Sequence, residues 1–280
     1  MTLSLGGKPV RRLGYGAMRI TGPGIWGPPR DHDEAIRVLR RAVELGVTFI
    51  DTADSYGPEV SEDLIREALY DGRGYDDVVI ATKGGFTRSG PNQWAAVGRP
   101  AYLRQCIQMS LRRLGVDRID LWQLHRIDPE TPREDQFGVL KEFVEEGLAA
   151  QIGLSEVTVD DVEQARAAGV PVASVQNRYN LGDRRAEDLV DYCTEQGIAF
   201  IPWAPVDAGS LARPGGPLDE VARSHPGTTT GQLALAWLLR RSPIMVPIPG
   251  TSTVEHLEEN CAAADVELTD EEYEALTKAG

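Results

Sequence analysis

Short runs of apolar and β-branched residues alternate along the chain with longer stretches in which apolar residues recur every three to four positions. The first pattern is typical of strands buried on both faces, and the second is typical of amphipathic helices. Eight strands are predicted, at residues 13–18, 48–52, 78–83, 119–125, 151–155, 172–177, 199–203 and 244–249. A helical segment follows each strand, and the clearest of these segments cover residues 33–46, 61–72 and 134–147.

This alternation predicts an α/β fold. Regular strand–helix units favour a parallel sheet, and eight of them favour closure into a (β/α)8 barrel of the TIM type, with a doubly wound open sheet as the alternative. Residues 2–10 predict a short β-hairpin with Gly6 and Gly7 at its turn, placed where it can plug the bottom of the barrel. Because no linker or low-complexity tract interrupts the pattern, we expect a single domain over residues 1–280.

Charge and cysteine content narrow the classes of partner. The chain has 29 basic and 43 acidic side chains, and its formal net charge of −14 disfavours binding to nucleic acid or to anionic membranes. Cys106, Cys193 and Cys261 are far apart, and none has a Cys or His at metal-ligand spacing, which predicts reduced thiols and no bound metal. The first residues lack the apolar run of a secretory signal and no stretch resembles a membrane span, so we expect a cytoplasmic protein.

One segment imitates a dinucleotide-binding fingerprint. Residues 22–27, GPGIWG, match G-x-G-x-x-G, and Asp51 lies 24 positions after the last glycine. In that fingerprint the third glycine opens a helix whose N-terminus binds the pyrophosphate, but here Pro28 and Pro29 intervene and Asp31 is the expected N-cap. We therefore interpret the segment as a loop beside a pocket.

Four side chains suited to proton transfer lie at or just beyond consecutive strand ends. In a β/α barrel such positions meet at the mouth, where catalytic groups are found. Asp51 ends the second predicted strand, and Tyr56 follows in the loop DTADSYG. Lys83 ends the third strand and His125 ends the fourth. Each residue alone has an ordinary interpretation, such as a helix N-cap, a loop aromatic, a solvated strand end or a core histidine.

Together the four residues predict general acid catalysis. The ammonium of Lys83 favours the phenolate and so lowers the pKa of Tyr56, while Asp51 keeps the buried lysine charged. A tyrosine tuned in this way can protonate a carbonyl oxygen while a hydride reaches the carbon. His125 would then orient and polarise the carbonyl.

Motifs along the whole chain resemble those of the aldo-keto reductases. The matching segments, one for nearly every strand end, are GYGAM, FIDTADSYG, VIATKGG, DLWQLHR, IGLSEV, VQNRYNL, IPWAPV and IPGTSTVEHLEEN. The resemblance implies NAD(P)H-dependent reduction of aldehydes or ketones to alcohols, with Tyr56 as the proton donor. The implied catalytic tetrad is Asp51, Tyr56, Lys83 and His125.

The resemblance also implies a nicotinamide cofactor across the barrel mouth. Ser155 and Gln176 would hold its amide and Trp203 would stack on its ring, whereas Glu156 stands where relatives commonly have Asn. The loop 203–210 resembles the one that covers the pyrophosphate, although it is shorter than in many relatives. Further implied contacts are Gly16, Ala17 and Met18 near the first strand, and Ala204, Pro205, Val206, Gly209 and Ser210 in that loop.

The segment 250–260 resembles the family's adenosine site, where amides at a helix N-terminus bind phosphate. Its implied contacts are Gly250, Thr251, Ser252, His256, Glu259 and Asn260. Some relatives have Lys at the position of Gly250 and Arg at that of His256, and these cations contact the 2′-phosphate. Thr251, Ser252 and His256 can still bind that phosphate, so we expect NADP(H) to be favoured modestly over NAD(H).

Substrate specificity in the family comes from loops at the barrel mouth and from a C-terminal tail. This chain stops one helix after the adenosine motif, which predicts an open, shallow pocket. Trp26 and Trp94 are candidate aromatic walls of that pocket, although each can equally be a packing anchor.

Two other function classes compete with the reductase. A cofactor sensor or scaffold on the same fold would be expected to have a damaged tetrad, and an isomerase or hydrolase would need a metal cluster or paired carboxylates at the mouth. The sequence has neither feature. We therefore expect an enzyme acting on a small carbonyl compound, as a monomer or weak homo-oligomer.

Overall fold

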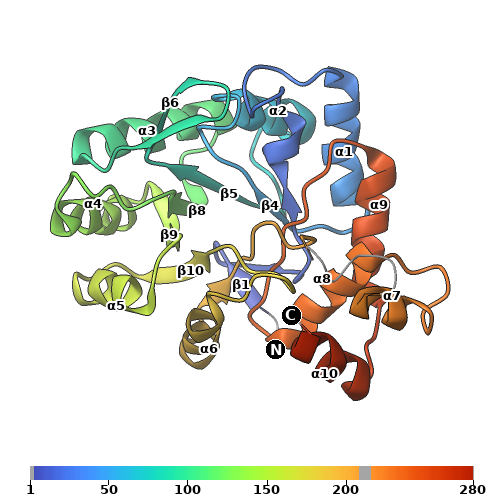
Figure 1. The fold of residues 1–280 in the computed structure, drawn as a ribbon. Coiled ribbons are helices and arrows are strands. Elements are labelled where there is room, and N and C mark those ends of the chain that lie inside the picture. The colour runs from blue at the N-terminus through green and yellow to red at the C-terminus, as the bar shows by residue number, and fades with distance from the viewer. Residues whose placement is uncertain (1–2, 208–215, 280) are drawn as a thin grey trace.

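A curled parallel sheet of seven strands forms the centre of the molecule, in the order β11-β10-β9-β8-β5-β4-β3 (Figure 1). The computed structural model describes residues 3–207 and 216–279. The strands are β3 (Tyr15–Gly16), β4 (Phe49–Asp51), β5 (Val79–Gly84), β8 (Ile119–Leu124), β9 (Ala149–Ser155), β10 (Val172–Gln176) and β11 (Ala199–Phe200). Neighbouring strands pair in parallel, as the strand–helix alternation predicts.

The eighth predicted strand, residues 244–249, closes the sheet without regular strand geometry. On one side Phe200 exchanges two backbone hydrogen bonds with this segment, of 3.0 and 2.8 Å. On the other side the amides of Gly14 and Gly16 donate to its carbonyls at 3.0 and 3.4 Å. Two prolines in the segment lack an N–H, so a full ladder cannot form. The chain nevertheless forms the predicted (β/α)8 barrel.

Helices cover the outside of the sheet (Figure 1). They are α1 (His32–Glu44), α2 (Val60–Leu69), α3 (Pro100–Leu114), α4 (Arg133–Glu145), α5 (Val159–Ala167), α6 (Glu187–Gln196), α7 (Pro217–Ala222), α8 (Thr230–Arg241), α9 (Val254–Ala262) and α10 (Asp270–Ala279), with 3-10 turns η1 (Ala17–Ile20) and η3 (Ala263–Asp265). The predicted N-cap of α1 is confirmed, because Asp31 accepts a 2.9 Å hydrogen bond from the amide of Glu34. None of the helices in the described part of the chain has the length and apolar character needed to cross a membrane.

The predicted N-terminal hairpin consists of β1 (Leu3–Leu5) and β2 (Lys8–Val10). Its turn needs glycine, because Gly6 and Gly7 have φ angles of 60° and 80°. Leu5 belongs to the same buried cluster as residues of the barrel strands. The Gly6 amide also donates to the side chain of Gln151, near the start of β9, at 2.6 Å. The hairpin therefore plugs the end of the barrel at which the strands begin, opposite the predicted tetrad.

A second hairpin, which the sequence did not predict, lies at the barrel mouth between β5 and α3. It consists of β6 (Phe86–Gly90) and β7 (Gln93–Ala96), which pair in antiparallel register. The glycine-rich loop 22–27 contacts this hairpin, since the amide of Asn92 donates to the carbonyl of Gly24 at 2.9 Å. The loop therefore packs against the hairpin, but none of residues 22–27 lines the cavity described below, so its interpretation as a loop beside a pocket stays a prediction.

Candidate active site

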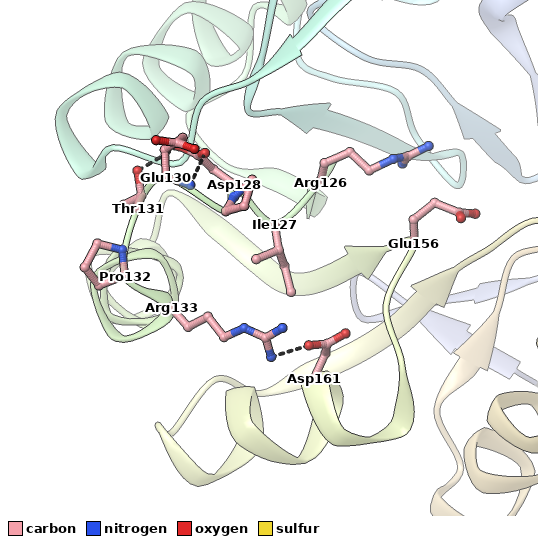
Figure 2. A pocket seen from close by; sticks show the side chains of 10 residues that line it. Arg126, Ile127, Asp128, Glu130, Thr131, Pro132, Arg133, Glu156 and Asp161 are labelled. Carbon is pink, nitrogen blue, oxygen red and sulfur yellow. Dashed lines mark hydrogen bonds and ion pairs between the residues drawn. The ribbon is translucent and has the colours of Figure 1, made fainter.

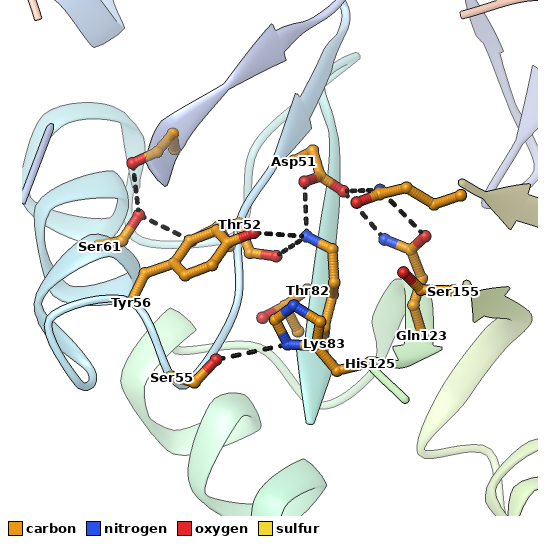
Figure 3. Close-up of polar contacts among 12 residues, drawn as sticks. Asp51, Thr52, Ser55, Tyr56, Ser61, Thr82, Lys83, Gln123, His125 and Ser155 are labelled. Carbon is orange, nitrogen blue, oxygen red and sulfur yellow. Dashed lines mark hydrogen bonds and ion pairs between the residues drawn. The ribbon is translucent and has the colours of Figure 1, made fainter. Parts of the chain in front are cut away.

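The predicted tetrad comes together at the C-terminal ends of β4, β5 and β8 (Figure 3). Asp51 and Lys83 lie at the ends of β4 and β5, His125 directly follows β8, and Tyr56 lies in the loop between β4 and α2. All four are buried, with exposures of 0% for Lys83, 2% for Asp51, 6% for His125 and 7% for Tyr56. The prediction from the strand ends that these four side chains meet is therefore confirmed.

A buried ion pair is the centre of the site. The Lys83 Nζ atom lies 2.5 Å from Asp51 Oδ1, and it also donates to the carbonyl of Thr52 at 2.7 Å and to the Tyr56 hydroxyl at 3.4 Å. Burial alone would lower the pKa of Lys83, but the Asp51 carboxylate and Tyr56 reverse that effect, so the pKa is raised. Lys83 is therefore an ammonium at neutral pH.

Two glutamine side chains hold the second oxygen of Asp51. The Nε2 atoms of Gln123 and Gln176 donate to Asp51 Oδ2 at 2.9 and 2.8 Å. Sequence reasoning did not single out Gln123, although a lone amide within the apolar strand IDLWQLH was a signal that could have found it. With both oxygens bonded, the carboxylate has no freedom to turn away from Lys83.

The pKa of Tyr56 differs from the sequence-based expectation. Burial raises it, the ammonium of Lys83 lowers it and the Asp51 carboxylate raises it, with a net increase. The expected net decrease is not found, because burial outweighs the effect of the Lys83 charge, and the closer Asp51 carboxylate compensates part of that charge. Tyr56 consequently keeps its proton at neutral pH.

His125 is held in its neutral form. Burial lowers its pKa well below the ordinary value, and the charges of Lys83, Arg126 and Arg88 lower it further. The Nδ1 atom lies 3.4 Å from the Ser55 hydroxyl, and no described residue hydrogen-bonds to Nε2. The ring is edge-on to that of Tyr56, with 5.9 Å between centroids.

The tetrad opens onto a cavity of about 700 Å³, a size that suits small-molecule binding. Phe86 and Trp94, from the unpredicted hairpin, line it together with Trp203. Trp26 is not among the lining residues. The Arg88 guanidinium lies over both tryptophan rings, 3.5 Å from the centroid of Trp94 and 5.6 Å from that of Trp26. Of the two aromatic walls suggested by sequence, only Trp94 faces the cavity.

Many of the implied cofactor contacts also line this cavity. These are Gly16, Met18, Ser155, Gln176, Trp203, Ala204, Pro205, Val206 and Gly250. Ala17 is buried, and the cavity does not reach Glu156, Thr251, Ser252, His256, Glu259 or Asn260. Gly209 and Ser210 lie outside the described residues. One continuous hollow thus joins the tetrad to the expected nicotinamide and pyrophosphate positions.

Glu156, where relatives commonly have Asn, orients an aromatic ring. Its backbone has a positive φ of 55°. Its carboxylate accepts hydrogen bonds from Trp203 Nε1 at 2.6 Å and from the amide of Arg178 at 2.7 Å. The departure from the family pattern therefore fixes Trp203, the ring expected to stack on nicotinamide.

The backbone around Gly250 leaves no room for the lysine side chain that some relatives have at this position. A Cβ atom there would lie 2.8 Å from the carbonyl oxygen of Gly16, so a side chain needs the backbone to shift. The Cγ atom of Arg19 would lie 3.5 Å from the same Cβ, and Arg19 lines the cavity from η1. A cation that sequence reasoning missed therefore lies beside the position that is lysine in some relatives.

Farther along the implied adenosine site, some of the polar groups already have protein partners. Thr253 caps α9 by accepting from the amide of His256, at 3.4 Å. The Glu259 carboxylate accepts from the Thr229 hydroxyl at 2.7 Å. His256 itself is exposed, so its ring is accessible from solvent beside the helix N-terminus.

Arg88, which the sequence analysis did not single out, connects the loops around the cavity by hydrogen bonds. Its Nη1 atom donates to the carbonyls of Ile25 and Ser55 at 2.9 and 2.6 Å, and its Nη2 donates to that of Gly24 at 3.0 Å. The three βα loops at this side of the mouth are thereby tied together.

Among the described residues, no cluster of three or more His, Cys, Asp or Glu side chains is arranged to hold a metal ion.

Known proteins with similar sequences are oxidoreductases. An uncharacterised oxidoreductase of Schizosaccharomyces pombe is 54% identical over 279 residues, covering 100% of this chain and 90% of that protein. Pyridoxine 4-dehydrogenase of Escherichia coli is 43% identical over 281 residues, covering 98% of this chain and 96% of that enzyme.

Solved structures and a family profile agree with these relatives. A thermostable aldo-keto reductase, solved with the inhibitor epalrestat, superposes with a TM-score of 0.86 at 31% identity, over 100% of both chains. An aldo/keto reductase from Klebsiella pneumoniae, solved with NADP and acetate, gives a TM-score of 0.82 at 25% identity, over 99% of this chain and 94% of that one. The profile of the Aldo/keto reductase family matches residues 12–280. The chain therefore belongs to the aldo/keto reductase family and is an NAD(P)H-dependent oxidoreductase.

Proposed function

We propose that this enzyme reduces aldehydes or ketones to alcohols, with Tyr56 as the proton donor. The observation that carries the proposal is the buried Lys83 ammonium, which contacts both Asp51 and the Tyr56 hydroxyl beside the cavity. A bound nicotinamide cofactor supplies the hydride. The residues of the chain bind the substrate, exclude water and manage the proton.

Tyr56 is suited to donate a proton because it is protonated at neutral pH and lies next to a fixed cation. Its raised pKa keeps the hydroxyl proton in place until a carbonyl oxygen develops negative charge. As the proton leaves, the Lys83 ammonium at 3.4 Å stabilises the phenolate that forms. Asp51 keeps that ammonium charged and pointed at the phenol.

His125 fits the role of a neutral partner for the carbonyl. Its Nε2 atom has no hydrogen-bond partner among the described residues, and its ring borders the cavity next to Tyr56. We place the carbonyl oxygen between the Tyr56 hydroxyl and this nitrogen. A neutral imidazole polarises the carbonyl there without competing with Tyr56 as an acid.

Aromatic aldehydes are the substrates that the cavity walls support best. Phe86 and Trp94 lie on one side of His125, with ring centroids 4.5 and 6.3 Å from the imidazole. A planar ring can pack against these walls while its aldehyde reaches Tyr56. The relative named pyridoxine 4-dehydrogenase acts on a substituted pyridine, which makes the pyridoxal–pyridoxine pair a suitable first substrate to test.

The Tyr56→Phe variant tests the proton donor. Loss of the hydroxyl should lower kcat for aldehyde reduction about 10²- to 10⁴-fold, the usual contribution of a general acid, while quenching of protein fluorescence by NADPH is retained. Tyr70→Phe, at a tyrosine that does not line the cavity, is the matched control. Undiminished turnover in Tyr56→Phe would rule out the assigned role. A wild-type protein that binds NADPH but reduces no carbonyl compound would instead favour the sensor or scaffold alternative.

The charge state of His125 can be followed by NMR of ¹³C-labelled histidine. Because its pKa is lowered, we expect His125 signals to stay constant from about pH 8 to about pH 6, whereas the exposed His32, whose pKa is raised by Glu67 and Asp33, titrates in that window. The unfolded chain takes up this proton near pH ~6.5 and the folded chain does not, so His125 reduces stability as the pH falls below that value. Ordinary titration of His125 near pH ~6.5 would contradict the assignment.

We also propose NADP(H) as the preferred cofactor, with Arg19 contacting a phosphate. Parallel fluorescence titrations should give tighter binding of NADPH than of NADH, and Arg19→Met should weaken NADPH binding by about tenfold or more, as expected for a charge-assisted contact. Arg112→Met, at an exposed arginine away from the cavity, should leave both affinities unchanged. A preference for NADH by more than about tenfold, or ~1.4 kcal/mol, would contradict the cofactor assignment.

A further inference from the structure

One arginine that lines the cavity has no role in the proposed proton transfer. Arg126 directly follows His125, is half-buried, and lines the cavity together with Tyr56, His125 and Phe86. Building on the proposed reductase function, we propose that Arg126 binds an anionic oxygen on the substrate, so that the preferred substrates are aromatic aldehydes that carry a carboxylate or phenolate group.

One nitrogen of the Arg126 guanidinium anchors the side chain, and in the described part of the chain the other two have no hydrogen-bond partner. The Nη1 atom donates to the carbonyl of His125 at 2.6 Å and to the Ser155 hydroxyl at 3.0 Å. Nε and Nη2 have no hydrogen-bond partner among the described residues. Arginine presents its donors in a planar fork that matches a carboxylate. The anchored side chain therefore offers unused donors to an oxygen anion.

No carboxylate of the described residues forms an ion pair with Arg126. In Figure 2 the Arg126 guanidinium points away from Asp128 and Glu130, which border the neighbouring polar recess. Glu156 is the carboxylate whose charge acts on Arg126, but its oxygen is bonded to Trp203 Nε1 and to the amide of Arg178.

The other cations near the substrate end are already engaged. Lys83 is paired with Asp51, and Arg88 donates to backbone carbonyls of the surrounding loops. Arg19 lies at the other end of the cavity, beside Gly250. A protein with a formal net charge of −14 repels anions at long range, so an anionic substrate requires a local cation of this kind.

The aromatic wall and the cation are adjacent. Arg126 Cζ lies 5.6 Å from the centroid of Phe86, and Phe86 lies 4.5 Å from the imidazole of His125. A substrate ring packed on Phe86, with its aldehyde directed to Tyr56, therefore brings a ring substituent within reach of Arg126. This juxtaposition of a flat wall and an open guanidinium is what selects aromatic anions over neutral aldehydes.

The test compares each carboxybenzaldehyde isomer with its own methyl ester, which removes the negative charge and keeps the ring and the aldehyde. With saturating cofactor, the ratio of kcat/KM for acid over ester is measured in the wild type, Arg126→Met, Arg126→Lys and Arg19→Met. For the isomer that the wild type uses best, we expect the acid to be favoured and the ratio to fall at least tenfold in Arg126→Met, mainly through KM.

The remaining variants separate charge from general damage. Arg126→Lys keeps the charge but not the planar fork and should retain part of the ratio, and Arg19→Met should leave the ratio unchanged because both compounds use the same cofactor. An equal loss for acid and ester in Arg126→Met would show that Arg126 only positions Ser155 and His125, and would overturn the inference. A wild type that reduces esters but shows no preference for any acid would overturn it too. Failure of the wild type to reduce any of the compounds would overturn the proposed function itself, and the inference with it.

Discussion

The ion pair between Lys83 and Asp51 is the interaction on which the rest of the site depends. Two charges with no more than 2% exposure are costly to bury, and they are tolerated only when their remaining hydrogen-bonding capacity is satisfied. Here Gln123 and Gln176 saturate the free carboxylate oxygen, and the Thr52 carbonyl accepts from the ammonium. The ion pair and its two glutamine partners therefore connect β4, β5, β8 and β10 at the mouth of the barrel. The packing of these strands and the geometry of the tetrad depend on the same interactions.

The same burial sets the electrostatics of the reaction. Desolvation raises the pKa of Tyr56 and lowers that of His125, so the phenol is protonated and the imidazole neutral when substrate arrives. In the proposed mechanism, Lys83 acts on the phenolate that remains after proton transfer and does not make the phenol strongly acidic beforehand. Arg19 and Arg126 line the cavity of this acidic protein. In the proposed mechanism Lys83 serves the developing oxyanion, and Arg126 serves a substrate that is itself negatively charged.

The sequence predicted the barrel and the tetrad because both depend on regular spacing. Buried strands separated by amphipathic helices are visible as a pattern, and the C-terminal ends of parallel strands must meet, which placed Asp51, Lys83 and His125 together. The β6–β7 hairpin was missed because a short, half-exposed ribbon has no comparable signal, and Phe86 and Arg88 were missed with it. The net pKa of Tyr56 could not be predicted either, since it depends on three-dimensional burial and on how closely Asp51 compensates Lys83.

The central claim is that Lys83 acts through the hydroxyl of Tyr56, and a double-mutant cycle tests it most directly. The value of kcat/KM for aldehyde reduction would be measured in the wild type, Tyr56→Phe, Lys83→Met and the double variant, with the fold of each checked by circular dichroism. If the two residues work as one unit, Lys83→Met should be strongly damaging in the wild type and cost little more once the hydroxyl is gone. Equal losses from Lys83→Met in both backgrounds would contradict the account.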